Sequence, residues 1–278
     1  MRVARVLAAV AAGALLAAFA GALGGQAATA RPGATARPIA TPRWHPLPGL
    51  SWQVQFSGRL DLSVAADVFE LDGLDTTAAT VAALRTASKR TVCYIAAGSW
   101  ERWRGDAKRF PAAVLGRPLE GWPDERWLDI RRLDVLLPLL RARIADCAGK
   151  GFDGVEFDNV DGYTNHTGFP LRAADQLRSN RALAAEAHRR GLAVGLKNDL
   201  DQVRQLVSAF DWAINEQCFA YDECAKLLPF VAAGKPVVVI EYATATGIFC
   251  PAATELGFAA MRKRLALNAW RQACPRLR

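Results

Sequence analysis

The stretch "GFDGVEFDNVDGY", residues 151–163, places four carboxylates within nine residues of an otherwise apolar segment. Charged side chains are costly to bury, and Asp and Glu are poor strand formers. Because side chains alternate faces along a strand, Val155 and Phe157 can face one layer while Glu156 and Asp158 face the other, about 6.6 Å apart. The pattern predicts a strand with a polar inner face, with Asp158 at the mouth of an opening and Glu156 one layer deeper.

Short apolar strands alternate with helical segments along the chain, which is the pattern of repeated βα units. Helices are expected over 75–89, 135–151, 172–191 and 253–270, the first opened by capping residues and the next two ended by glycines. Eight strands in a domain of about 235 residues predict an α/β fold, a single (β/α)8 TIM-type barrel. An open doubly wound sheet is the structural alternative. The expected strands are 52–57, 67–71, 91–96, 127–130, 153–158, 192–197, 211–216 and 236–241.

The N-terminus has the pattern of a secretory signal peptide over residues 1–30, with a basic start, an Ala-rich apolar region and a small-residue cleavage site. Residues 31–43 are rich in Pro, Ala and Thr and predict an extended linker. The globular domain is therefore expected over 44–278, secreted from the cell. An uncleaved membrane anchor is the alternative, since about 20 apolar residues can span a bilayer.

Six cysteines in a secreted chain indicate disulfides, and six allow 15 pairings. Cys218 and Cys224 can close a small local loop, and Cys250 and Cys274 can fasten the C-terminus. Cys93 and Cys147 then remain as a possible third pair. No C-x-x-C motif occurs, which argues against a zinc knuckle or a thioredoxin-like site.

The formal net charge is +8, and removal of Arg2 and Arg5 with the predicted signal peptide leaves +6. Such a surplus can indicate an anionic partner. The arginines, however, are scattered and often close predicted helices, where a cation is favourable. Since no basic stripe carries regularly spaced aromatics, we expect a solvated basic surface and no nucleic-acid partner.

Polar residues gather where the expected strands end, which is the end that carries the active site in TIM-type barrels. They are Glu70, Asp72, Glu156, Asp158, Lys197, Asn198, Asp199, Glu216 and Glu241. Two facing carboxylates can hydrolyse a glycosidic bond, one protonating the leaving oxygen and the other attacking the sugar or activating water. The alternative is a purely structural role, in which the acids pair with Lys197 or arginine and only fill a polar barrel mouth. For Glu156 the sequence does not decide between the two roles.

Several ordered motifs between about Trp52 and Tyr242 resemble the endo-α-1,4-polygalactosaminidase family, glycoside hydrolase family 114. The resemblance implies a TIM-type barrel that cleaves α-1,4-linked galactosamine polymers, with the conserved acids of the family falling on Asp158 and Glu216. Phe157 stands where relatives often have proline. The motifs are "CYIAAGSWE" (93–101), "GWPDERWLDIR" (121–131), "GFDGVEFDNVDGY" (151–163), "TGFPL" (167–171), "GLKNDL" (195–200) and "NEQCFAYDEC" (215–224).

We therefore expect Asp158 and Glu216 to be the catalytic pair. Asp158 is assigned as the nucleophile because Lys197 is expected nearby, and Glu216 as the acid/base because its surroundings are less polar. Aromatic faces for sugar rings are sought among Tyr94, Trp100, Trp103, Trp122, Tyr163 and Tyr221. The residues expected to bind substrate are Tyr94, Glu156, Asp161, Tyr163, Lys197, Asn198, Asp199, Tyr221 and Glu241.

The expected partner is a cationic galactosamine-containing polysaccharide, which an acidic cleft attracts. The positive net charge of the protein repels such a polymer at long range. Because salt screens charges over about 8 Å, the acidic residues of the cleft determine the attraction at short range. We expect a monomer, with no metal, no cofactor and no membrane contact after signal cleavage.

Two other functions fit parts of the pattern. A class I aldolase could use Lys197 as a Schiff base, although neighbouring carboxylates would keep that amine protonated. A non-catalytic glycan-binding or adhesion barrel would need the aromatics and acids but no competent pair.

Overall fold

The computed structural model describes residues 43–275 of the 278-residue chain. The predicted signal peptide and all but the last residue of the predicted linker lie outside the described residues. Within the described part, no helix has both the length and the apolar composition needed to cross a bilayer.

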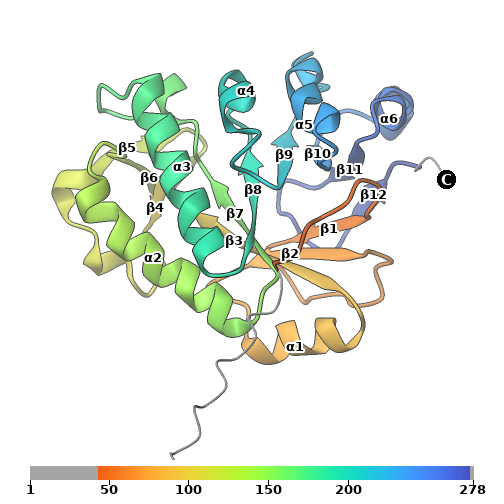
Figure 1. The fold of residues 1–278 in the computed structure, drawn as a ribbon, viewed down its shortest axis with the longest axis horizontal. Helices are drawn as coiled ribbons and strands as arrows, with labels where there is room; N and C mark the ends of the chain where they lie inside the picture. The colour runs from red at the N-terminus through yellow and green to blue at the C-terminus, as the bar shows by residue number, and fades with distance from the viewer. Residues whose placement is uncertain (1–42, 276–278) are drawn as a thin grey trace, which may run out of the picture. The chain divides into compact units, whose positions relative to one another are not determined.

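A nine-stranded sheet forms the centre of the domain, with helices around its outside (Figure 1). Eight parallel strands follow one another, and β12 pairs antiparallel with β11 at one edge. The two edges lie side by side, since Phe56 N donates to Leu267 O at 2.8 Å and the Gln53 side chain donates to Ala269 O at 2.9 Å. The fold is thus a nearly closed, TIM-like barrel. In spatial order its strands are β1 (Trp52–Gln55), β2 (Val68–Asp72), β3 (Arg90–Ala96), β7 (Gly154–Asp158), β8 (Ala193–Lys197), β9 (Trp212–Glu216), β10 (Val237–Glu241), β11 (Ala259–Lys263) and β12 (Arg271–Ala273).

The helices begin and end where the local sequence favours it. Before α1, the Thr77 side chain accepts a hydrogen bond from Thr80 N and caps the helix. α2 ends at Gly151, whose φ of 90° is accessible to glycine without strain. The α-helices are α1 (Ala78–Thr86), α2 (Leu133–Lys150), α3 (Ala173–Arg189), α4 (Val203–Leu206), α5 (Leu228–Ala232) and α6 (Thr246–Glu255), and the 3-10 helices are η1 (Ala107–Arg109), η2 (Ala112–Val114), η3 (Gly162–Thr164), η4 (Leu200–Gln202) and η5 (Cys224–Leu227).

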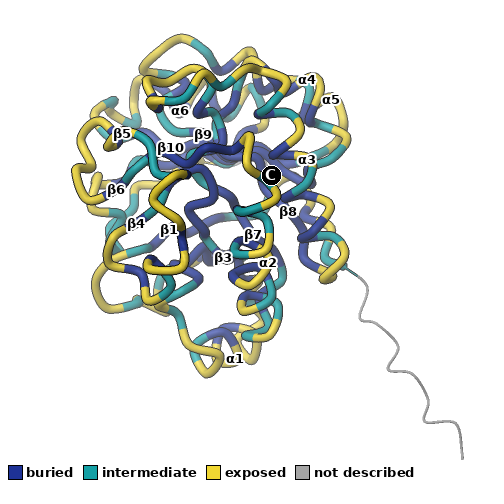
Figure 2. Tube along the Cα trace, turned by 90° about the vertical axis from the view of Figure 1, so that its left-hand side faces the viewer, coloured by how far each residue is buried: buried dark blue, intermediate teal, exposed yellow. Residues whose placement is uncertain are grey.

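Apolar side chains form two separate cores, one on each face of the sheet. Val155 and Phe157 belong to the core between the sheet and the helices. Trp52, Trp212 and Ile214 belong to the core inside the barrel, and Figure 2 shows the strands as the most buried part of the chain. The side chains of β7 therefore alternate as the sequence predicts, which turns Glu156 and Asp158 toward the barrel interior.

Two predicted elements are wrong. Residues 127–130 do not form a barrel strand, because their first half belongs to β6 in a separate antiparallel sheet of β4 (Ser99–Glu101), β5 (Leu115–Leu119) and β6 (Trp122–Leu128). The helix predicted over 253–270 ends early: α6 stops at Glu255, Gly257 turns the chain with a φ of 73°, and Ala259–Lys263 form the eighth parallel strand. The sheet does contain eight parallel strands, as predicted, but the eighth is Ala259–Lys263 and not residues 127–130.

A buried arginine ties the small sheet to the barrel. Arg104 donates to both carboxylate oxygens of Asp72 at the end of β2, at 2.9 and 2.6 Å, and to Glu101 of β4 at 2.6 Å. Bidentate pairing of this kind fixes orientation as well as distance. It anchors residues 99–128 at the rim of the barrel mouth.

All six cysteines are paired, in the arrangement that the sequence favours. Cys93–Cys147 joins β3 to α2, Cys218–Cys224 closes the loop after β9, and Cys250–Cys274 links α6 to the segment after β12. The second of these disulfides fixes the loop that follows Glu216.

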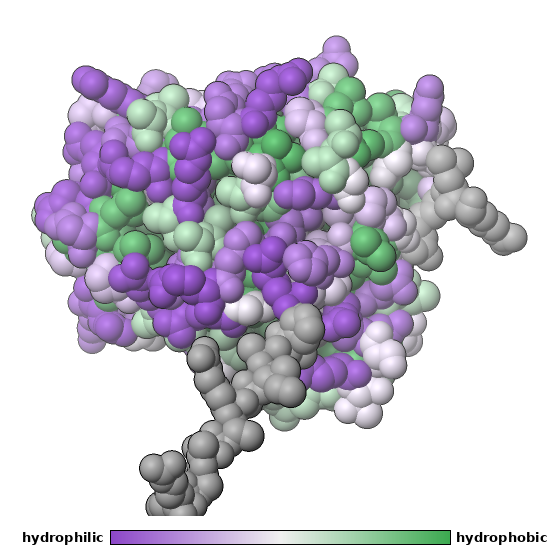
Figure 3. Space-filling model, viewed as in Figure 1, coloured by the Kyte–Doolittle hydropathy of each residue, from purple (hydrophilic) through white to green (hydrophobic). Residues whose placement is uncertain are grey.

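Hydrophilic side chains cover much of the face seen in Figure 3 and divide its hydrophobic areas. Among the exposed large side chains of the described residues are Trp103, Trp122 and Tyr221, at 55, 50 and 65 % exposure. Trp103 and Trp122 line one cavity at the barrel mouth, and Tyr221 lines its neighbour. Exposed aromatic surface is thus present where a ligand can reach it.

Candidate active site

Three adjacent strands end in charged residues that meet at the barrel mouth. Asp158 closes β7, Lys197 closes β8 and Glu216 closes β9. A non-glycine residue with positive φ is uncommon and costly, and such residues gather at functional sites. The residue after each of these strands has a left-handed backbone: Asn159 (φ 61°), Asn198 (φ 50°) and Gln217 (φ 68°).

Lys197 lies between the two predicted catalytic acids. Its Nζ is 3.0 Å from Oδ1 of Asp158 and 3.3 Å from Oε2 of Glu216. These two oxygens therefore cannot lie further apart than about 6.3 Å, the length of the two contacts laid end to end. Each acid also accepts a hydrogen bond from a tyrosine, Tyr94 donating to Asp158 at 2.9 Å and Tyr242 donating to Glu216.

The surroundings hold Asp158 ionised and Lys197 charged. Burial alone raises the pKa of Asp158, but the charge of Lys197 and hydrogen bonds from Lys197, Tyr94 and Asn159 N outweigh it and leave the pKa below its usual value. Burial likewise lowers the pKa of Lys197, yet Asp158, Glu216 and Glu156 raise it well above its usual value. At neutral pH the site thus holds a carboxylate at Asp158 and, at Lys197, an ammonium group that lacks the free electron pair a Schiff base needs.

Glu156 lies one layer deeper and is almost fully buried. Its Oε1 is 3.8 Å from Lys197 Nζ. Burial first, and then the charge of Glu70, raise the pKa of Glu156 well above its usual value. The surroundings of Glu156 therefore disfavour its charged form, whereas those of Asp158, two residues on, favour it.

A cleft of about 630 Å³ opens above these residues. One wall is formed by β6 of the small sheet, which contributes Trp122 and Glu125, and by the turn after β4, which contributes Trp103. Burial raises the pKa of Glu125 to about 7, although Ser99 donates a hydrogen bond to it. Trp100 faces elsewhere and donates its indole N–H to Ala107 O. The cleft thus combines aromatic surface with titratable groups along one wall.

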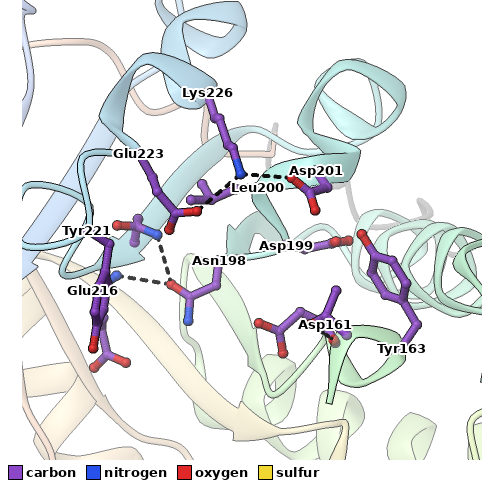
Figure 4. Close-up of a pocket in the computed structure, with 12 residues that line it drawn as sticks. Asp161, Tyr163, Asn198, Asp199, Leu200, Asp201, Glu216, Tyr221, Glu223 and Lys226 are labelled. Carbon is purple, nitrogen blue, oxygen red and sulfur yellow. Dashed lines mark hydrogen bonds and ion pairs between the residues drawn. The ribbon is translucent and has the colours of Figure 1, made fainter.

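A second cavity, of about 330 Å³, adjoins the cleft and shares Asn198 and Glu216 with it. We call it the side pocket, and define it by Asp161, Tyr163, Asp199 and Tyr221 (Figure 4). In Figure 4 the hydroxyl end of Tyr163 lies beside the carboxyl group of Asp199.

Within residues 43–275, no ion pair joins Asp161 or Asp199 to a cation, whereas Lys197 pairs with both central acids. Burial, followed by the charge of Asp158, raises the pKa of Asp161 to about 6. Burial, followed by the charge of Asp161, raises the pKa of Asp199 to about 8. Lys226 lies at the rim and already binds Asp201 and Glu223, at 2.9 and 3.1 Å. The pocket thus presents one half-buried acid, Asp161, and one buried acid, Asp199.

The structure does not bring Glu241 into the cleft. Val237 and Val239 of the same strand belong to the core between the sheet and the helices, and Glu241 faces the same side. It is fully buried there and accepts a hydrogen bond from Phe219 N at 2.9 Å. The expectation that Glu241 binds substrate is therefore corrected to a role in holding the loop after β9.

The residue that reaches the mouth from β10 is Tyr242, which the sequence interpretation missed. Ile240 points inward and pairs with Glu216 in the strand register, so the next inward position is Tyr242. Counting faces along "PVVVIEY" from the buried valines would have found it.

Among the described residues, no group of three or more His, Cys, Asp or Glu side chains is arranged to hold a metal ion.

Comparison with known proteins assigns this arrangement to a family. The model of glycoside-hydrolase family GH114 matches residues 33–277. The structure of Aspergillus fumigatus Ega3 in complex with galactosamine superposes with a TM-score of 0.80 and 36 % identity, over 84 % of this chain and 98 % of that one. The glycoside hydrolase domain of PelA from Pseudomonas aeruginosa shares the fold, with a TM-score of 0.63 and 17 % identity over 81 % of this chain and 98 % of that domain. An uncharacterised protein of Deinococcus radiodurans is 28 % identical, over 86 % of this chain and 89 % of its own length. With its barrel, its paired acids and a family match that spans nearly the whole domain, the chain belongs to glycoside hydrolase family GH114.

Proposed function

We propose that this protein is a secreted endo-acting glycosidase that cleaves α-1,4-linked galactosamine polymers through Asp158 and Glu216. The observation that carries the proposal is the pair of carboxylates joined by Lys197 at the mouth of a barrel of this family. The galactosamine bound by Ega3 supports the choice of sugar.

Asp158 is proposed as the nucleophile and Glu216 as the acid/base. An oxygen of Asp158 attacks the anomeric carbon while Glu216 gives its proton to the departing glycosidic oxygen. Glu216 then takes a proton from water, whose oxygen displaces Asp158 from the sugar and restores both groups. Lys197 and Tyr94 keep Asp158 ionised for the first step.

The spacing of the two acids supports retention of configuration. Retaining glycosidases hold their carboxyl groups about 5–5.5 Å apart, whereas inverting enzymes need about 6.5–9.5 Å to admit a water. The upper limit of about 6.3 Å between the two oxygens held by Lys197 lies below the inverting range.

The side pocket is proposed to bind the ammonium group of a galactosamine unit next to the scissile bond. Asp161 and Asp199 supply the negative charge, and the tyrosine rings of Tyr163 and Tyr221 supply apolar surface. Asn198 belongs to both cavities and accepts hydrogen bonds from Glu216 N and the Asn215 side chain, which positions it to orient the sugar. On the far side of the cleft, Trp103 and Trp122 offer faces for sugar rings.

Secretion is proposed from the N-terminal pattern of the sequence. The three disulfides suit an oxidising compartment outside the cytosol. A polymer substrate that cannot enter the cell fits the same location, and a monomer is sufficient because the described site draws on one chain.

The test is release of reducing ends from a de-N-acetylated α-1,4-galactosamine polymer, with the fully N-acetylated polymer as the matched control. We expect release from the first and far less from the second. A protein that binds the polymer but releases no reducing ends would favour the non-catalytic alternative. A keto substrate trapped on Lys197 by borohydride would favour the aldolase.

A further inference from the structure

Glu125 of β6 is a buried acid on the wall of the cleft that the proposed chemistry leaves without a role. It is 8 % exposed and lines the cleft together with Asp158 and Glu216. Its Oε2 accepts a hydrogen bond from the Ser99 hydroxyl at 2.8 Å. Its other oxygen, Oε1, accepts no hydrogen bond from the described residues, yet it is not enclosed by protein. Glu125 therefore presents one free carboxyl oxygen to the cleft.

A chain of hydrogen bonds fixes Glu125 relative to the proposed nucleophile. The Ser99 hydroxyl accepts a hydrogen bond from the Asn159 side chain at 2.8 Å, and Asn159 N donates to Oδ1 of Asp158 at 2.8 Å. Gly98 N donates to Asp158 O at 3.0 Å, and a side chain at Gly98 would collide with the backbone of Asn159. The small sheet thus packs directly against the end of β7, and the place of Glu125 beside the reacting centre is set.

The charge of Glu125 is not matched by a cation of the cleft. Among the described residues, the cations that line the cleft are Arg104 and Lys197. Arg104 already pairs with Asp72 and Glu101, and Lys197 already pairs with the two proposed catalytic acids. Burying a carboxylate without a cation is costly, and a glutamine could accept the same hydrogen bond from the serine without that cost. A cation that comes from outside gives the charge a use.

The same wall carries aromatic surface of the kind that binds sugar rings. Trp103 and Trp122 line the cleft with Glu125, and about half of each indole side chain is exposed. An aromatic face packs against the apolar side of a ring, and a neighbouring carboxylate can accept a charge-assisted hydrogen bond from an ammonium substituent. The wall therefore combines the two features that a galactosamine unit requires.

This wall is distinct from the side pocket. Glu125 lines the cleft and not the side pocket, whereas Asp161 and Asp199 line the side pocket and not the cleft. The two cavities meet at Asn198 and Glu216, which line both. The acids of the two cavities can thus bind different units of one chain.

We propose that Glu125 is a second amine-binding residue: its free oxygen takes the ammonium group of a galactosamine unit that lies on the tryptophan wall of the cleft, while the side pocket takes the ammonium group of another unit. The inference rests on the proposed function, because it assigns a further subsite for the same polymer. Efficient cleavage then requires free amines at two positions of the chain rather than at one.

The first experiment measures hydrolysis of a de-N-acetylated oligosaccharide by E125Q. The glutamine keeps the shape of the side chain and removes its charge, and E255Q, which removes one exposed carboxylate of α6, is the control for overall charge. We expect KM to rise about tenfold in E125Q, as for the loss of one charge-assisted hydrogen bond, with kcat little changed. An unchanged KM would overturn the proposal, and so would a loss confined to kcat, which would make Glu125 a catalytic residue instead.

The double variant E125Q/D199N shows whether the two acids bind different amines. If they do, the two effects on binding add, and KM rises about a hundredfold. If the double variant is no weaker than the single ones, both acids act on one amine and the second subsite is overturned.

Calorimetry separates this inference from the proposed function, since it follows binding without hydrolysis. De-N-acetylated and N-acetylated pentasaccharides are titrated into D158N and into D158N/E125Q. We expect E125Q to weaken binding of the first about tenfold and to leave binding of the second unchanged. Equal losses for both ligands, or none, would overturn the proposal. If wild type binds the polymer but releases no reducing ends, the proposed function fails, while the calorimetry still decides the role of Glu125.

Should E125Q not fold, a crystal structure of D158N with the de-N-acetylated pentasaccharide decides. We expect an amine nitrogen about 2.7–2.9 Å from Oε1 of Glu125, the distance of a charge-assisted hydrogen bond. A chain bound in the cleft that reaches Glu125 only through hydroxyl groups or water would contradict the assignment.

Discussion

The centre of the barrel mouth and the side pocket each hold a pair of acids, and among the described residues an ion pair with a cation is found for the central pair but not for Asp161 and Asp199. Asp158 and Glu216 share Lys197, and the pKa of Asp158 is lowered as a result. Asp161 and Asp199 have no such partner, and burial raises their pKa values to about 6 and about 8. In the proposed function, the acids that share Lys197 carry out the chemistry, whereas Asp161 and Asp199 bind the cation of the substrate.

Removing either central acid should have the largest effect. In D158A and E216A we expect kcat to fall by roughly 10²–10⁴-fold or more, because a positioned acid or base contributes about that factor and a nucleophile can contribute more. Reducing-end assays measure the loss, and circular dichroism checks the fold against the E255Q control. Near-normal activity in both folded variants would move the chemistry to another pair of acids.

Replacing the central cation should come next. In K197M the charge that lowers the pKa of Asp158 is gone, so that pKa rises and the acidic limb of the pH–rate profile moves to higher pH by about one unit or more. K197R retains the charge and serves as the control. If the acidic limb of the pH–rate profile lies at the same pH in K197M and in wild type, Lys197 does not set the ionisation of Asp158.

The centre was predictable from the sequence because it depends on alternation and strand ends. Asp158 and Glu216 follow apolar residues whose faces can be counted, and the counting held for β7 and β9. It was not applied to β10, where Glu241 occurs one residue past the position that pairs with Glu216 and therefore faces outward.

Elements that depend on distant packing were harder to predict. The strand β11 consists mainly of Ala, Met and Lys, which favour helices, and its pairing with β10 on one side and β12 on the other makes it a strand. The small sheet of β4 to β6 is fixed to the barrel by Arg104, whose contact with Asp72 spans 32 residues of sequence. Glu70 was seen as a strand-end acid, but the strand register places it level with Gly154, two residues before Glu156.

In the side pocket, D199N should weaken substrate binding rather than the chemical step. A charge-assisted hydrogen bond is worth about 1.5–3 kcal/mol, so KM for a de-N-acetylated oligosaccharide should rise roughly tenfold with kcat little changed. KM for an N-acetylated analogue should not respond. In wild type, KM should fall as pH rises from 6 to 8, because the pKa of Asp199 is about 8 and its proton must leave before it can pair with an ammonium group. An equal rise in KM for both substrates would contradict the proposal that Asp199 pairs with the ammonium group.

The smallest effect concerns stability. Because the pKa of Asp199 is raised from 3.8 to about 8 on folding, its contribution to stability is complete below pH 4 and is lost as pH rises through 8. D199N should therefore gain Tm relative to wild type between pH 4 and pH 9, by roughly 2–4 °C for each kcal/mol. Differential scanning fluorimetry across this range measures the gain, and a difference that is independent of pH would contradict the raised pKa.

The most direct test of the central claim is azide rescue of the two alanine variants, followed by NMR of the glycosyl azide formed from an α-linked galactosamine substrate. In D158A, azide takes the place of the missing nucleophile and attacks the anomeric carbon directly, so the account predicts a β-galactosaminyl azide. In E216A, Asp158 still forms the glycosyl–enzyme intermediate, and azide then displaces it to give the α-azide. The reverse pattern would exchange the roles of Asp158 and Glu216, and the absence of rescue in both variants would contradict a covalent, retaining mechanism.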